Sequence, residues 1–392
     1  MEEWKEYKLG EISTFSQGIQ VDIDKQYSDY KPGRVRFIRI VDFTRNDEPI
    51  RFIDKPRDKC LTEDGDIVMI RYGSQTAGLV AISYDGAIAN NIFKITFNNA
   101  VVSNEFGYYY LSQKSIFDFL RGAQSSSTMP AITFEIASRV PLFLPPIKEQ
   151  ERITKILKSL DDKIEVNRRI NENLEQQAQA LFKSWFVDFE PFKDQPFVES
   201  ELGMIPQGWR VGNLFDIASI YDKNRKPLSG KDRENMERIY PYYGATSCMD
   251  YVDNYLFDGI YTLIGEDGSV VKEDGLPYMQ YVWGKFWVNN HAHILQGKNG
   301  FSTEMIHVFL SITNIQHLVT GAVQAKLSQA NMQKIILPIP DKRVIDMIRP
   351  VIDGLYEKKR NIEDESRRLT ELRDTLLPRL MSGEINVNEV KL

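Results

Sequence analysis

Residues 153–185 read ITKILKSLDDKIEVNRRINENLEQQAQALFKSW. Mostly apolar residues recur along this stretch in alternating steps of four and three, at Ile153, Leu157, Leu160, Ile164, Asn167, Asn171, Leu174, Ala178, Leu181 and Trp185. The same steps return 195 residues later, at Ile348, Ile352, Leu355, Lys359, Ile362, Ser366, Leu369, Arg373, Leu376 and Leu380. Such a sustained spacing with charged flanks is typical of coiled coils and predicts two long helices that pack on each other. The alternative is that each helix packs only on its own domain.

Four polar residues lie at these seam positions and modify the expectation. Asn167 and Asn171 would cost stability there but can fix the register of the pair. Lys359 and Arg373 predict that the seam of the second helix is rotated locally. At about 1.5 Å per residue, a helix of roughly 40 residues would be about 60 Å long, so such a pair would act as a spacer.

The segments that precede the two helices also repeat each other. WKEYKLGEI at residues 4–12 returns as WRVGNLFDI at 209–217, and GDIVMI at 65–70 is similar to GIYTLI at 259–264. Residues 88–95 likewise match residues 287–294 around a shared Asn-Asn pair. Self-similarity on this scale predicts one structural unit used twice, in the order domain, helix, domain, helix. The expected segments are 1–144, 145–195, 196–340 and 341–392.

Composition narrows the class of protein. With 42% hydrophobic residues among 392, the chain can form two or three ordinary cores. No apolar run of about 18 residues is present, so we expect no membrane span, and the N-terminus lacks the basic and apolar pattern of a signal peptide. The two cysteines, Cys60 and Cys248, stand far apart without metal-ligand spacing, which fits a reducing cytoplasm and predicts no zinc site.

The net charge of −6 by itself argues mildly against nucleic-acid binding. Two basic clusters soften this objection. Residues 31–59 carry nine Lys and Arg against five acidic residues, and residues 223–233 carry five against Asp232 alone. A solvated charged surface explains either cluster as well, so charge permits DNA binding without establishing it.

Four sequence signatures resemble the specificity subunits of type I restriction–modification systems. LPPIKEQ at residues 144–150 and LFKSWFVDFEP at 181–191 resemble the two ends of that family's central helix. LGMIPQGW at 202–209 resembles the start of its second target-recognition domain, and LLPRLMSGEI at 376–385 the end of its second helix. The second half departs from the pattern, since IPDKR at 339–343 replaces the Pro-Pro-x-x-Glu-Gln motif, which puts partner docking on that side in doubt.

The resemblance implies an α+β fold of two mixed α/β target-recognition domains with curved, mostly antiparallel sheets, joined by two long antiparallel coiled-coil helices. Each domain would read one half-site of double-stranded DNA, and the helices would set the gap between the half-sites. The helices would also dock methyltransferase subunits, two of them, and through the complex a motor–nuclease restriction subunit. The family implies no cofactor on this chain; S-adenosylmethionine, ATP and Mg²⁺ would be bound by the partner subunits. We expect a cytoplasmic protein with no membrane partner.

Polar loops that follow the repeated strands are the candidate DNA contacts. Arg can read guanine, and Asn or Gln adenine, through paired hydrogen bonds in the major groove, whereas Glu and Asp accept from cytosine but repel phosphate. An ordinary polar turn is the alternative for each loop, and local backbone hydrogen bonding is the alternative for the Asn residues. The candidates are Arg36, Arg39, Arg71, Tyr72, Gly73, Ser74, Gln75, Thr76, Asn90, Asn91, Gln124, Ser125, Lys223, Arg225, Lys226, Glu266, Asp267, Ser269, Asn289, His291, Gln324 and Lys326.

The candidate subunit and coiled-coil interface is apolar. It comprises Leu157, Leu160, Ile164, Leu174, Leu181, Trp185, Phe186, Ile352, Leu355, Ile362, Leu369, Leu376 and Leu380. His291 and His293, two apart in an expected strand, share a face and could in principle share a metal, but a structural role is favoured because no cysteine lies nearby.

No phosphate-binding loop, methyltransferase motif, serine elbow or zinc-protease motif occurs, so we expect no catalytic site. Three hypotheses remain at this point: a DNA-specificity subunit, a nuclease that acts alone, and a coiled-coil scaffold whose domains bind protein.

Overall fold

The chain forms two compact units that share both long helices. The computed structural model describes residues 4–45, 48–123, 131–321 and 324–387. Unit 1 comprises Met1–Glu165 and Arg367–Leu392, and unit 2 comprises Val166–Ser366. Each unit therefore contains one globular domain together with one part of each long helix.

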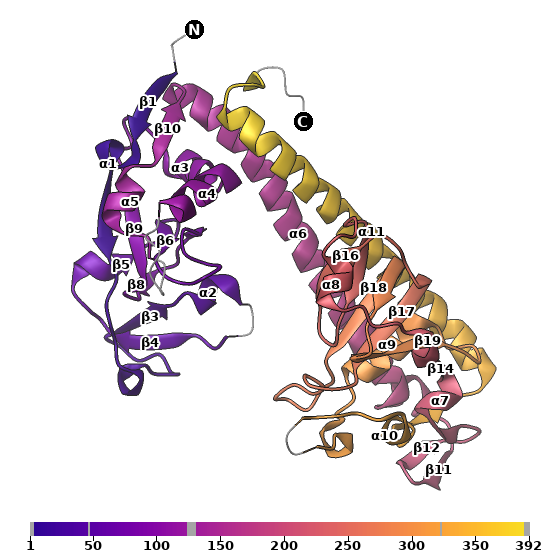
Figure 1. Ribbon diagram of the computed structural model, residues 1–392. Helices are drawn as coiled ribbons and strands as arrows, with labels where there is room; N and C mark the ends of the chain where they lie inside the picture. Colours follow the sequence, from indigo (N-terminus) through magenta and orange to yellow (C-terminus); the bar gives the residue numbers. More distant parts are fainter. Residues whose placement is uncertain (1–3, 46–47, 124–130, 322–323, 388–392) are drawn as a thin grey trace. The chain divides into compact units, whose positions relative to one another are not determined.

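The two long helices are α6 (Ile147–Phe186) and α11 (Lys342–Met381), each of 40 residues. They lie side by side (Figure 1). Within unit 2, the Asn167 amide donates to Glu365 at 2.8 Å, and Glu175 pairs with Lys359 at 3.3 Å. Numbers rise along α6 as they fall along α11, so the pair is antiparallel, as predicted.

The predicted seam is buried or half-buried, and its polar members Asn167, Lys359 and Arg373 have partners on the other helix. Every residue of the candidate helical interface is buried or half-buried. Lys359 pairs with Glu175, and Arg373 donates to Asp161 at 2.7 Å within unit 1. The cations expected to rotate the seam are thus neutralised by carboxylates of α6.

Each globular core takes side chains from both long helices. In unit 1, Leu157 of α6 and Leu380 of α11 enter the same core. In unit 2, Phe186 of α6 and Ile352 of α11 do so. The alternative that each helix packs only on its own domain is therefore wrong. No helix among the described residues has the length and apolar character needed to cross a bilayer.

Unit 1 contains two four-stranded sheets and one two-stranded sheet. The first, all antiparallel, has the order β2 (Ser13–Gln17), β9 (Ile92–Phe97), β6 (Ile67–Ile70), β7 (Val80–Ile82). The second has the order β4 (Arg51–Asp54), β3 (Arg34–Ile38), β8 (Gly86–Ile88), β5 (Leu61–Thr62), with only β3 and β8 parallel. The small sheet pairs β1 (Lys5–Lys8) with β10 (Pro141–Leu144).

The helices of the unit 1 domain are short. They are α1 (Leu9–Ile12), α2 (Val41–Thr44), α3 (Asn104–Leu111), α4 (Lys114–Gly122) and α5 (Phe134–Ser138), with the 3-10 turns η1 (Ile23–Lys25) and η2 (Asp58–Cys60). Ser103 and Thr133 begin α3 and α5 by accepting a hydrogen bond from a backbone N–H of the first turn, as N-cap residues do.

Unit 2 has one six-stranded sheet in place of the two larger sheets of unit 1. Its order is β14 (Ala218–Ile220), β19 (Ala292–Gly297), β17 (Phe257–Gly265), β18 (Met279–Val288), β15 (Tyr240–Tyr243), β16 (Cys248–Val252). The small sheets pair β13 (Arg210–Asn213) with β20 (Ile336–Ile339) and β11 (Phe197–Ser200) with β12 (Gly203–Pro206). The short helices are α7 (Leu214–Ile217), α8 (Gly230–Arg233), α9 (Thr303–Ser311) and α10 (Gln329–Met332), with η3 (Glu190–Phe192), η4 (Asp222–Asn224) and η5 (Gln316–Leu318).

The two domains repeat each other in topology. The β1–β10 ribbon corresponds to β13–β20, the β2–β9–β6 order to β14–β19–β17, and the parallel pair β3–β8 to β15–β18. The ten-residue strand β18 runs without a break where unit 1 has the separate strands β7 and β8. The internal repeat predicted from sequence is therefore present in the structure.

Candidate nucleic-acid interface

In unit 1 the loop after the buried strand β6 is fixed by two backbone hydrogen bonds. The Arg71 N–H donates to the Asn91 carbonyl at 2.8 Å, and the Ile132 N–H donates to the Arg71 carbonyl at 2.8 Å. The next residue, Tyr72, forms a bridge with Ala131. The 71–76 loop is thus held between two other loops of the same domain.

The Arg71 guanidinium lies against aromatic rings. Its Cζ is 5.2 Å from the Tyr72 ring centroid and 5.8 Å from that of Phe134, within cation–π range. Gly73 has φ +123°, and the Thr76 hydroxyl donates to the Tyr72 carbonyl at 3.0 Å, which closes the loop. Ser74 and Gln75 are exposed at its tip. This arrangement leaves amide and hydroxyl groups outermost, with a half-buried cation behind them.

Unit 2 repeats this framework bond for bond. The Glu266 N–H donates to the His291 carbonyl and the Leu327 N–H donates to the Glu266 carbonyl, both at 2.8 Å. Asp267 forms a bridge with Lys326, as Tyr72 does with Ala131. Glu266 therefore stands where unit 1 has Arg71.

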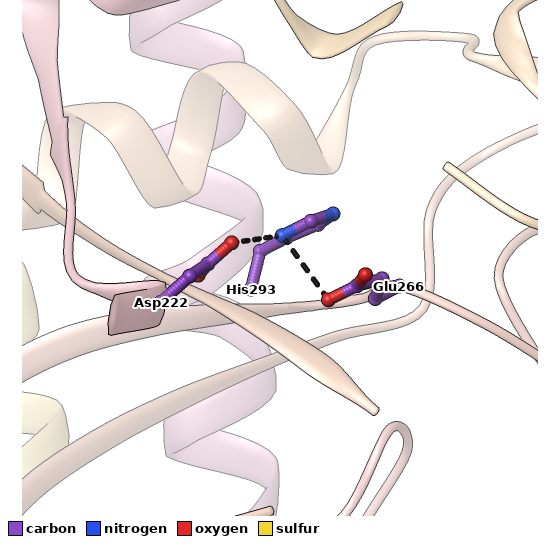
Figure 2. A group of neighbouring side chains, drawn as sticks. All are labelled: Asp222, Glu266 and His293. Atoms are coloured by element: carbon purple, nitrogen blue, oxygen red, sulfur yellow. Dashed lines mark hydrogen bonds and ion pairs between the residues drawn. The ribbon is translucent and has the colours of Figure 1, made fainter. Parts of the chain in front are cut away.

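Beneath the unit 2 loop lies a buried cluster of charged side chains. His293 lies between the carboxylates of Asp222 and Glu266, with its Nδ1 2.5 Å from Asp222 Oδ2 and 3.6 Å from Glu266 Oε2 (Figure 2). Arg225 donates to Glu266 Oε2 at 2.6 Å and to the Ala292 carbonyl at 2.8 Å. Gln329 donates to Asp222 Oδ2 at 2.7 Å.

Both ring nitrogens of His293 have polar partners. Nδ1 faces the Asp222 carboxylate, and Nε2 lies 2.7 Å from the Leu327 carbonyl oxygen. The ring is thus fixed at both nitrogens by oxygen atoms of two other segments. Burial alone would raise the pKa of Asp222, but the hydrogen bond and charge of His293, the Ile294 amide and the Arg225 guanidinium hold that pKa below its ordinary value.

Asp222, Glu266 and His293 bring three potential metal ligands within 4.8 Å of one another. The donor set does not suit a cation, however. Arg225 and Gln329 already donate to the carboxylate oxygens that a metal would need, and the guanidinium places a positive charge beside them. The geometry favours a cluster in which Arg225, and not a metal ion, supplies the positive charge.

The basic residues predicted from the first cluster are paired inside unit 1. Arg36 lies 3.5 Å from Asp42 and 4.0 Å above the Tyr84 ring, and Arg39 donates to Asp42 at 3.1 Å and to the Pro49 carbonyl. Asp42 is almost fully buried. In the second cluster, Lys223 and Lys226 are exposed, whereas Arg225 belongs to the buried ion cluster.

The Asn residues at the starts of β9 and β19 have different environments. Asn289 is buried and accepts from the His291 N–H at 2.8 Å, the local backbone role considered as the alternative. Asn90 and Asn91 line a cavity of about 350 Å³ with Gln20, Gln26 and Arg39. The Asn91 Oδ1 is buried and has no hydrogen-bond partner among the described residues.

The remaining predicted residues lie at the edge of the loops. Asp267 contacts the His291 ring through Nδ1, and Ser269, Gln324 and Lys326 are exposed. Gln124 and Ser125 lie outside the described residues. The structure thus brings Arg71, Tyr72 and Asn91 together in unit 1, and Arg225, Glu266, Asp267, His291 and Lys326 together in unit 2.

Sequence reasoning missed Asp222 and Gln329, and it considered His293 only for a structural or metal role. Asp222 stands 71 residues from His293, and no local spacing links the two. A weak signal was present in the sequence. Asp222 directly precedes a basic stretch that contains Lys223 and Arg225, and an isolated carboxylate in such a place often pairs with a cation.

The chain thus contains two versions of one domain, each with a matched polar loop and each with a core that takes side chains from both long helices. The sequence model described as "Type I restriction modification DNA specificity domain" matches residues 1–176 and 206–363, so the chain belongs to this family. Specificity subunits are the non-catalytic members of type I systems, and this chain is accordingly not an enzyme by itself.

Relatives and a solved structure agree with this assignment. The chain is 27% identical to the type I restriction enzyme MjaIX specificity subunit of Methanocaldococcus jannaschii, over 80% of this chain and 76% of that protein. It is 26% identical to the HindI specificity subunit of Haemophilus influenzae, over 98% and 100%. The crystal structure of the type I S subunit from M. genitalium aligns over 96% of each chain with a TM-score of 0.54 at 16% identity, which shows a common fold.

Proposed function

We propose that this specificity subunit reads a two-part target in double-stranded DNA, with one half-site for each domain. The observation that carries the proposal is the matched pair of loops at residues 71–76 and 266–269. Their backbones are held by equivalent hydrogen bonds, but their side chains differ, beginning with Arg71 against Glu266. One scaffold with two different sets of polar groups suits two unlike half-sites, because base edges are distinguished by donor and acceptor pattern.

The antiparallel helix pair supports the second part of the proposal. Two helices of 40 residues that contribute to both cores would hold the domains at a fixed separation and so set the unread gap in the target. The same helices would dock two methyltransferase subunits, and through the complex a restriction subunit. Those partners would bind S-adenosylmethionine, ATP and Mg²⁺, and the assembly would act in the cytoplasm in defence against phage.

Methylation mapping tests the proposal directly. The chain is co-expressed with its cognate methyltransferase subunit in a host that lacks other methylation, and the modified adenines are sequenced. A split motif with two unlike short halves and a fixed gap is expected. Replacing residues 196–340 with those of a relative should change one half alone. A stable complex that methylates no defined motif would refute the proposal.

A further inference from the structure

The buried ion cluster of unit 2 joins four segments that meet around the 266–269 loop. Asp222 and Arg225 come from the first segment, Glu266 from the second, His293 from the third and Gln329 from the fourth. Arg225 also donates to the carbonyls of Asn290 and Ala292 at 3.2 and 2.8 Å. Each of the four segments therefore contributes at least one hydrogen bond to the cluster.

The cluster is buried, and its carboxylates lie against Arg225 and the His293 ring. The side chains of Asp222 and His293 are 4% and 1% exposed. The Arg225 guanidinium and the His293 ring each contact both Asp222 and Glu266. Removing a charged member leaves an opposite charge without its partner in a poorly solvated place, so the segments that carry Asp222, Arg225, Glu266 and His293 are tied together.

The outer edge of the cluster carries exposed groups that can meet DNA. Glu266 Oε1 lies 3.5 Å from the Lys326 ammonium, which is 52% exposed, while Asp267 pairs with the ring of His291. Lys326 can donate to guanine or to phosphate. The inner oxygen of Glu266 is held by Arg225 and the outer one faces Lys326, so the cluster fixes where this exposed cation lies.

Unit 1 shows that the fold itself does not require this cluster. The β14–β19 pairing ends at Ile220 and Leu295, and two further residues along the same register place Asp222 opposite His293. In the equivalent pairing of unit 1, β2–β9, Gln17 lies opposite Phe93. Gln329 corresponds to Phe134, two residues after the equivalent anchors Leu327 and Ile132. Phe93 and Phe134 simply pack edge to face at 5.2 Å. In unit 2 this layer is charged, and the loop above it carries Glu266 where unit 1 has Arg71. The change in both points to a role for the cluster beyond folding.

We infer that Asp222 and His293 are positioning residues for the second half-site: they hold Glu266, and through it Lys326, in the geometry that discriminates base pairs. The inference rests on the function proposed above. Its consequence is asymmetric, since the loop for half-site 2 rests on buried charged groups, whereas the corresponding layer under the loop for half-site 1 consists of the rings of Phe93 and Phe134.

The test uses the complete methyltransferase complex and measures methylation rates on duplexes that carry single base-pair substitutions in either half-site. Asp222→Asn is nearly isosteric and removes the negative charge that faces His293 and Arg225. We expect it to lower discrimination about fivefold or more at one or two base pairs of half-site 2 and to leave half-site 1 unchanged. Glu266→Gln should act on the same base pairs, and the double variant should be no worse than the more severe single variant.

Glu304→Gln provides the matched control. Glu304 is an equally buried carboxylate of unit 2 that accepts from Tyr281 at 2.8 Å and from Arg360 at 2.7 Å, and it takes no part in the ion cluster. Its loss should lower stability without changing base preference. If Asp222→Asn does not fold, Gln329→Leu, an exposed residue with one bond to Asp222, should affect the same base pairs at least about twofold.

Three results would overturn the inference. They are unchanged discrimination in half-site 2, an equal effect of Glu304→Gln, or additive effects of Asp222→Asn and Glu266→Gln. Each presupposes that the wild-type complex methylates a split motif. If it does not, the proposed function fails first, and the two failures are thereby distinguished.

Discussion

The Arg71 loop of unit 1 and the Glu266 loop of unit 2 share one backbone framework and carry opposite charges. Arg71 lies over the rings of Tyr72 and Phe134, whereas Glu266 lies against Arg225 and His293. In each case the layer beneath complements the charge above it, a π face for the cation, and a guanidinium with an imidazole ring for the carboxylate. The comparison teaches that the framework is constant, while loop and supporting layer change together.

The largest expected effect comes from breaking the helix pair that both domains share. Leu174 and Leu369 lie in the seam, and replacing both with Asp buries two charges, which should cost roughly 4 kcal/mol or more in the free energy of unfolding. We expect methylation of the split target to be lost while each domain stays folded, as hydrogen exchange would show. Leu372→Asp is the control, because Leu372 lies on the same helix but is 44% exposed. Equal damage from the control would contradict the seam assignment.

Acid should affect the stability of the two units differently, because all four histidines of the chain lie in unit 2. Burial, with smaller contributions from Lys359 and Lys272, lowers the pKa of His307 from 6.5 to about 3. The unfolded chain therefore binds a proton that the folded chain does not, so this stabilisation is complete above pH 6.5 and is lost as pH falls toward 3. The loss should reach roughly 3 kcal/mol by pH 4.

Hydrogen exchange followed separately in the two units is the measurement. Unit 2 should open first on acidification. His307→Gln can still accept from the Thr262 hydroxyl, which lies 2.6 Å from His307 Nδ1, but it does not titrate in this range. It should remove most of the difference between the units. Identical acid profiles for wild type and variant would show that His307 is not responsible.

Reversing the charge of the Arg71 loop without changing the layer beneath it should impair the function of unit 1 alone. In Arg71→Glu, a carboxylate would face the rings of Tyr72 and Phe134 with no cation beneath it. We expect about a hundredfold loss of methylation at targets with an intact half-site 1, from loss of the base contact proposed for Arg71 and from phosphate repulsion. Lys114→Glu, the same charge change at an exposed residue of unit 1, should have little effect. A comparable loss from both variants would mean that net charge, not loop geometry, governs binding.

Much of the fold could be predicted because the spacing of apolar residues and the internal repeat are visible in the sequence itself. The steps of four and three around Leu174 and Leu369 predicted the helix pair, and the paired segments at Trp4 and Trp209 predicted the repeat. Pro350 and Gly354 lie inside α11, where such residues usually interrupt a helix, yet packing of the seam outweighs their local preference.

The loops were found for the same reason, but their chemistry was not. That Arg225 is buried against Glu266, and that Asp222 lies against His293, depends on side chains brought together from segments far apart in sequence. No spacing encodes such a pairing, since the turn that follows β14 and the strand β19 become neighbours only through the tertiary fold. The roles of the individual loop residues in reading bases stay predictions.

The smallest expected effect concerns the glycines of the two loops. Gly73 has φ +123°, and a Cβ there would come within 2.1 Å of the Thr76 hydroxyl oxygen, whereas Gly268 has φ +79° with open space around it. Gly73→Ala should therefore cost about 2 kcal/mol or more and disturb half-site 1, because both the backbone conformation and the Thr76 hydrogen bond must change. Gly268→Ala should cost about 1 kcal/mol, from backbone conformation alone. Thermal unfolding together with methylation of single-substitution duplexes measures both effects. If the two alanine variants proved equally harmful, the closure of the Arg71 loop by Thr76 would not be what distinguishes it from its counterpart.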